Sequence, residues 1–111
     1  MKKPFLSVFI LSLVVIFSCT KDSTSNCGTT TYKYSTEISV ILTTKCNTSG
    51  CHNATAAGGL NLTAYSTVYE HRDHILEQIN AGRMPQSGSP QLTTDEKTKI
   101  VSWLNACAPN N

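Results

Sequence analysis

Two cysteines and a histidine stand close together in the middle of the chain, at Cys46, Cys51 and His52. Two thiols of this kind can add to the vinyl groups of a porphyrin, and an imidazole directly after the second thiol lies beneath the iron. Covalent haem attachment normally uses two residues between the cysteines, whereas this chain has four. Gly50, directly before the second cysteine, allows unusual backbone angles. We therefore predict that residues 47–50 bulge outward and leave both cysteines and the histidine in their usual roles.

A candidate for the second axial ligand of the iron is Met84, which Pro85 follows. A thioether is a soft, neutral ligand that raises the potential of a haem also bound by histidine. The residue before a proline is pushed toward extended backbone, which would present Met84 from a loop. The alternatives are that Met84 packs as an ordinary apolar residue, or that His71 is the distal ligand, because His71 lies nearer the apolar stripe of its segment.

The cysteine cluster also has interpretations without haem. In an oxidising compartment Cys46 and Cys51 would be able to form a disulfide. A zinc site would need His71 and His74 as further ligands, at a spacing tighter than that of zinc fingers. Arg83 is a candidate partner for a haem propionate, the alternative being a solvated arginine.

The N-terminal segment, residues 1–18, predicts a secretory signal. A positive start is followed by an apolar run that is too short to span a bilayer. Ile16 and Ser18 before Cys19 resemble a bacterial lipobox, which implies cleavage before Cys19 and a lipid on its thiol. Plain secretion and an uncleaved anchor helix are the alternatives. Residues 19–33 are rich in Ser and Thr and predict a flexible tether.

Loss of the signal peptide removes Lys2 and Lys3 from nine basic residues, so seven remain against seven acidic residues. No basic cluster remains, which argues against nucleic acid as a partner.

Of the five cysteines, Cys27 and Cys107 are left after lipidation and haem attachment. Export favours a disulfide between them, which would stabilise the fold by about 4–5 kcal/mol; the alternative is that one or both stay free.

The predicted domain, residues 34–111, is small enough that its own apolar core would be marginal. A large flat apolar ligand would complete that core. A first helix is expected from Ser35 or Thr36 into Cys46, although its β-branched residues would also suit a strand.

Two further helices are expected. One runs from about Ala64 to Asn80, with room for a break around residues 69–71, and ends at a left-handed Gly82. Its apolar stripe comprises Tyr65, Val68, Tyr69, Ile75, Leu76 and Ile79. The other begins at Thr93 with a capping box to Glu96, and carries Ile100, Val101, Trp103, Leu104 and Cys107.

Over residues 34–108 the chain resembles the small class I c-type cytochrome domains found in exported bacterial lipoproteins. The resemblance lies in the attachment motif, Gly58–Leu62 with Tyr65, Met84-Pro85, and Leu92 with Ile100 to Trp103. It implies an all-α domain with long loops that wrap one covalent haem c. Cys46 and Cys51 would form the thioethers, and His52 and Met84 would bind the iron. Ile100, Trp103 and Leu104 would lie near the porphyrin or belong to the core.

The expected function is that of a monomeric, lipid-anchored monohaem cytochrome that carries single electrons between redox proteins of the bacterial cell envelope, on the periplasmic or outer-membrane side. With both axial positions filled, the protein would be a carrier and not an enzyme. No triad and no paired carboxylates offer a competing chemistry. Two other functions stay open: a disulfide-bonded surface lipoprotein that binds a partner without haem, and a haem sensor in which Met84 does not bind the iron.

Overall fold

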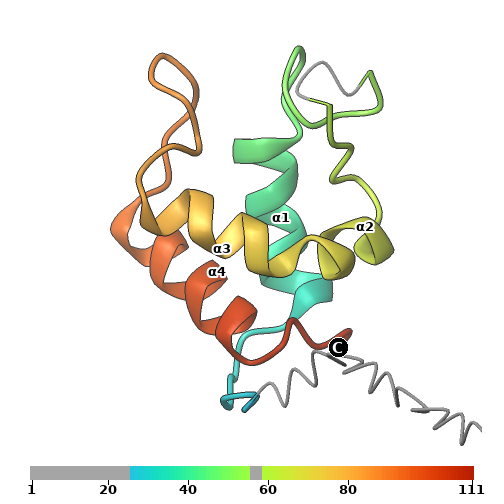
Figure 1. The fold of residues 1–111 in the computed structure, drawn as a ribbon, viewed down its shortest axis with the longest axis vertical. Coiled ribbons are helices and arrows are strands. Elements are labelled where there is room, and N and C mark those ends of the chain that lie inside the picture. Colours follow the sequence, from blue (N-terminus) through green and yellow to red (C-terminus); the bar gives the residue numbers. More distant parts are fainter. Residues whose placement is uncertain (1–25, 56–58) are drawn as a thin grey trace, which may run out of the picture.

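The computed structural model describes residues 26–55 and 59–111. The predicted signal peptide, Cys19 and the first part of the predicted tether lie outside these residues. The described part of the chain is helical and contains no strand, which confirms the all-α prediction (Figure 1). Within this part, no helix has both the length and the apolar character that crossing a membrane requires.

The first helix runs without a gap from Tyr34 to Cys46. It consists of η1 (Tyr34–Ile38) and η2 (Leu42–Cys46), both wide π turns, joined by α1 (Ser39–Ile41). Its inner face buries Ile38, Ile41 and Leu42 in the core. The helix therefore delivers Cys46 at its last residue, as the sequence predicts.

Hydroxyl side chains on the exposed face of this helix bond to its own backbone. Thr43 Oγ1 donates to the Ser39 carbonyl at 2.7 Å, and Thr44 Oγ1 donates to the Val40 carbonyl at 2.8 Å. Each bond reaches back one turn, so the exposed face keeps its polar groups satisfied within the helix. The β-branched residues thus lie on a helix whose apolar face is fixed by burial.

The second helical region is interrupted where the sequence leaves room for a break. α2 (Tyr65–Glu70) and α3 (Arg72–Asn80) meet at His71, whose backbone is not helical. Tyr69, in the last turn of α2, is 44 % exposed. The expectation that Tyr69 belongs to the apolar stripe is therefore wrong. The Arg72 guanidinium lies 4.6 Å from the centre of this ring.

Gly82 ends α3 with a φ of 66°, which confirms the predicted left-handed cap. Its N–H donates to the Ile79 carbonyl at 3.1 Å, and the Arg83 N–H donates to the Gln78 carbonyl at 3.0 Å. These two bonds form a Schellman motif. The chain then leaves the helix with Met84 two residues beyond the glycine.

The last helix, α4 (Thr94–Asn105), has the predicted capping box. The Glu96 N–H donates to Thr93 Oγ1 at 3.2 Å, and the Thr93 N–H donates to Glu96 Oε2 at 2.7 Å. α4 packs against α3 and η1. The largest fully buried side chains come from η1, η2, α2 and α4: Ile38, Leu42, Val68, Ile100 and Trp103.

Cys27 and Cys107 form a disulfide with a Cα–Cα distance of 5.2 Å, as predicted. The Gly28 N–H donates to the Asn105 carbonyl at 3.0 Å, and a β-carbon on Gly28 would come within 3.4 Å of that oxygen. The predicted tether extends to Lys33, but its residues from Cys27 onward lie against the end of α4. The disulfide and this close backbone approach are the physical reason for the difference.

Candidate functional site

The four residues predicted to hold haem line one cavity of about 270 Å³. Cys46, Cys51 and His52 belong to its wall, and so does Met84. The loops that border it follow η2 and α3, and Figure 1 shows both loops rising on the same side of the molecule. The structure thus brings together residues from two segments that are far apart in the sequence.

The rest of the lining combines apolar side chains with polar ones that are mostly uncharged. The apolar side chains are Leu60, Leu62, Ile75, Ile79, Pro85 and Leu92. The polar ones are Lys45, Gln78, Gln86, Ser89 and His74. Such a lining suits a largely apolar ligand whose orientation is fixed by a few polar groups at defined positions.

A tight turn connects the two cysteines. The Cys51 N–H donates to the Thr48 carbonyl at 3.0 Å, and the His52 N–H donates to the Cys46 carbonyl at 3.0 Å. Gly50 lies inside this turn with a φ of 80°. The left-handed backbone at Gly50 agrees with the predicted bulge of residues 47–50.

Both cysteines of the cavity are free thiols, so the alternative disulfide between them is not formed. Burial, with a smaller contribution from the neighbouring Cys51, raises the pKa of the Cys46 thiol to about 11. At neutral pH this thiol is protonated, whereas a nucleophilic cysteine needs a thiolate. Cys46 therefore does not have the lowered pKa of an activated cysteine.

The alternative zinc site is not assembled in the part of the chain that the structure describes. No group of three or more His, Cys, Asp or Glu side chains there is placed to hold a metal ion. His71 lies at the junction of α2 and α3 and is absent from the cavity lining, whereas His74 is part of it and is 60 % exposed. His71 was predicted as the alternative distal ligand, but it is His74, on α3, that lines the cavity.

One hydrogen bond determines which nitrogen of the neutral His52 ring carries the proton. Nδ1 lies 2.7 Å from the Leu60 carbonyl oxygen, which can only accept, so the proton of the neutral ring is on Nδ1. The lone pair is then on Nε2, which is free to bind a metal. The Leu62 N–H donates to the His52 carbonyl at 2.9 Å and holds the same two segments together.

The Leu60 carbonyl is the functional group that the sequence analysis missed. It is a backbone atom, so no side-chain pattern identifies it. The glycines at 58 and 59 predict only an irregular loop at this place. Gly59 has a φ of 77° directly before Leu60.

Met84 follows the end of α3 and is half-buried. Its peptide bond to Pro85 is cis. Its N–H donates to the Gln78 carbonyl at 3.2 Å. The neighbouring Arg83 is directed elsewhere: its guanidinium contacts Glu77 Oε1 at 2.7 Å and Gln78 Oε1 at 2.8 Å, and it is not among the lining residues. The contact of Arg83 with a propionate stays a prediction.

The large residues of α4 do not reach the cavity. Ile100, Trp103 and Leu104 are buried in the core and none of them lines the site. Of the two expectations for these residues, the structure supports packing in the core. Lys45, which the sequence analysis did not consider, is in the lining instead.

The donor set fits haem c. It comprises two free thiols, an imidazole with a free nitrogen and a thioether, which line one cavity together with apolar side chains. In comparisons with known proteins, no family model matches the chain, and neither a curated protein nor a solved structure matches it.

Proposed function

We propose that this protein is a lipid-anchored, monohaem c-type cytochrome that carries single electrons in the bacterial cell envelope. The observation that carries the proposal is the convergence of Cys46, Cys51, His52 and Met84 on one cavity. Bound there through two thioether bonds, haem c would supply a one-electron couple between ferrous and ferric iron.

The roles of the residues follow from their chemistry. His52 offers Nε2 as the proximal ligand, and its bond to the Leu60 carbonyl orients the ring and increases its basicity. Met84 offers a neutral sulfur that favours the reduced state. If both residues bound the iron, no coordination site would be left for a substrate, so the protein would act as a carrier and not as an enzyme.

The envelope location is supported by the disulfide and by the N-terminal sequence. A Cys27–Cys107 bond persists in oxidising compartments. The lipobox-like residues before Cys19 would anchor the chain to a membrane, and redox proteins of the envelope would be its partners. Because the mature chain has seven basic and seven acidic residues, net charge steers these encounters only weakly.

The test is to express the chain together with a cytochrome c maturation system. A denaturing gel stained for haem and a visible spectrum then report covalent attachment. We expect haem on the wild-type chain, and its loss when Cys46→Ala and Cys51→Ala are combined. Absence of haem from the wild-type chain would contradict the proposal and leave the haem-free binding lipoprotein as the better interpretation.

The axial assignment needs its own variant. We expect Met84→Ala to keep covalent haem but to lose the spectrum of a His/Met site, with a lower reduction potential. His71→Ala and His74→Ala are matched controls and should retain that spectrum. If Met84→Ala leaves the spectrum unchanged, methionine is not the distal ligand, and the haem sensor becomes the better interpretation.

A further inference from the structure

The loop that carries Met84 has few interactions of its own. From Met84 to Thr94 the sequence contains no charged residue. Its first residue is held by the Gln78 carbonyl and its end by the capping box of α4. The middle of the loop has bonds of its own, such as that from the Ser89 N–H to the Gln86 carbonyl at 3.0 Å, but these do not tie it to the helices.

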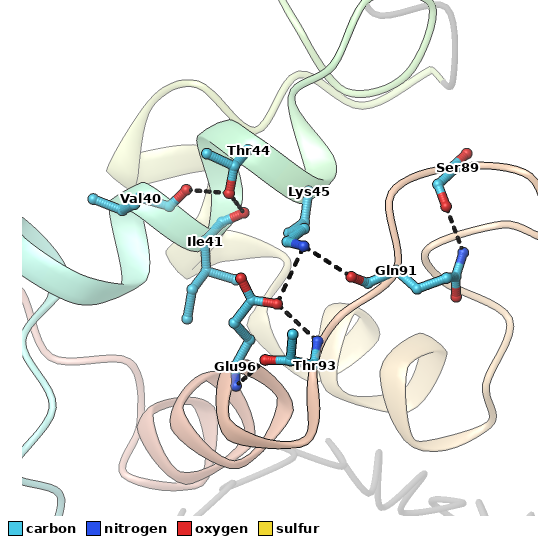
Figure 2. A network of polar contacts seen from close by, with 8 residues as sticks. All are labelled: Val40, Ile41, Thr44, Lys45, Ser89, Gln91, Thr93 and Glu96. Atoms are coloured by element: carbon cyan, nitrogen blue, oxygen red, sulfur yellow. Dashed lines mark hydrogen bonds and ion pairs between the residues drawn. The ribbon is translucent and has the colours of Figure 1, made fainter.

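Lys45 supplies a contact from the first helix. Its Nζ donates to the Gln91 carbonyl at 3.0 Å and lies 3.4 Å from Glu96 Oε2 (Figure 2). The side chains of Lys45 and Glu96 are only 21 % and 23 % exposed, so solvent screens this pair less than a surface pair. Lys45 directly precedes Cys46.

The Gln91 side chain extends this contact through the loop. Its Nε2 donates to the Gln86 carbonyl at 2.8 Å and to the Ser89 carbonyl at 2.9 Å. Gln86 is two residues after Met84, and both line the cavity. The position of the Gln91 backbone is thus coupled to the segment beside Met84.

Among the described residues, Lys45 makes the one hydrogen bond between the first helix and the loop from Met84 to Leu92. We propose that Lys45 is a positioning residue, which holds the loop that carries Met84 at a fixed place relative to the helix that carries Cys46. The consequence for the iron rests on the proposed function, whereas the ordering of the loop does not.

The direct test is amide hydrogen exchange in the full exported chain. In Lys45→Gln we expect peptides that cover residues 84–93 to exchange about tenfold faster, because a charge-assisted hydrogen bond and an ion pair are both lost. The amides of Ser89 and Thr93, which are bonded in the loop, should report the change first. In Lys45→Arg, which keeps the charge and the donors, exchange should stay close to that of the wild type.

Lys99→Gln is the matched control. Lys99, on α4, also reaches the first helix, through Glu37 at 3.8 Å; it contacts Asp95 of its own helix at 3.0 Å, and its 28 % exposure is similar. It does not touch the loop that carries Met84. If Lys45→Gln speeds exchange of this loop no more than Lys99→Gln does, the proposal is overturned.

A second measurement separates this proposal from the proposed function. In the haem-loaded protein, Lys45→Gln should keep covalent haem. It should lower the reduction potential and weaken the His/Met spectrum, two properties that loss of a purely structural residue would leave unchanged. A potential and a spectrum identical to those of Lys99→Gln would overturn the positioning role. If the wild-type chain takes up no haem, the proposed function fails, while hydrogen exchange still decides whether Lys45 orders the loop.

Discussion

The disulfide end and the cavity end of this molecule are held by different interactions. At the disulfide end, the chain termini of the domain, α4 and η1 meet beside the Cys27–Cys107 bond (Figure 1). At the cavity end, two loops project beyond the helices and carry Cys51, His52 and Met84. The difference indicates that stabilising interactions are concentrated at one end and the residues of the proposed haem site at the other.

The disulfide end is closed by aromatic side chains and by the last residues of the chain. Trp103 is fully buried, and its ring lies 5.5 Å from that of Tyr34. Trp103 Nε1 donates to the Pro109 carbonyl at 3.0 Å, and the Tyr65 hydroxyl donates to the Ala108 carbonyl at 2.9 Å. Covalent, apolar and polar interactions therefore reinforce one another here.

The cavity end depends on backbone turns and on a few polar bonds. Gly50 and Gly59 adopt left-handed angles, and a β-carbon on either would meet no atom within 4 Å. The His52–Leu60 bond and the Lys45 contacts connect the loops to the helices. Among the described residues of the two loops, Leu62 is the only buried apolar side chain, so the loops themselves have little packing to lose.

The largest expected effect on stability comes from removing the disulfide. The double variant Cys27→Ser, Cys107→Ser should lower the free energy of unfolding by about 4 kcal/mol, since the bond closes a long loop in the unfolded chain. Urea denaturation, monitored by circular dichroism, measures this change in the free energy of unfolding. Cys46→Ser with Cys51→Ser is the control and should cost less than about 1 kcal/mol. Equal losses in the two variants would remove the distinction between the two ends.

His52→Leu should have a smaller effect on stability, a loss of about 1–2 kcal/mol. The substitution leaves the Leu60 carbonyl without its partner. In a haem-loaded protein the same change removes the proximal ligand, so the visible spectrum should change far more than the stability. Denaturation and spectra of one preparation test both statements. A loss as large as that of the disulfide variant would show that His52 is chiefly structural.

Gly50→Ala should lower stability by about 1–2 kcal/mol through the backbone alone, because its φ is 80° and its surroundings are open. Gly50→Asn should recover part of this loss, since asparagine tolerates left-handed angles better than alanine. Thermal unfolding of the two variants measures the difference. Identical stability of Gly50→Ala and the wild type would contradict a turn that depends on this glycine.

The smallest expected effect concerns pH. The Thr93 N–H, and after it the Lys45 ammonium, lower the pKa of the Glu96 carboxyl in the folded protein. Its stabilising contribution is thus present above the unfolded pKa of about 4.3 and is lost as pH falls through the lower folded value. Glu96→Gln, which retains a capping side chain, should remove this part of the acid dependence, less than about 1 kcal/mol. Identical acid unfolding profiles of Glu96→Gln and the wild type would contradict this prediction.

Local features of the fold were predictable from the sequence. The capping box of Thr93 and Glu96, the left-handed Gly82 and the break near His71 each depend on residues a few positions apart. Such short-range preferences are present in the residue order itself. The first helix was less certain, because its β-branched residues suit two structures and only burial of its apolar face selects one.

The sequence by itself determined which side chains have the chemistry of the proposed site: Cys46, Cys51, His52 and Met84. The tertiary structure alone decided that the Leu60 carbonyl orients His52, that His74 and not His71 faces the cavity, and that Lys45 meets Glu96. The physical reason is that a backbone carbonyl has no residue signature. The orientation of α3 and the Lys45–Glu96 contact, in turn, depend on how the helices pack.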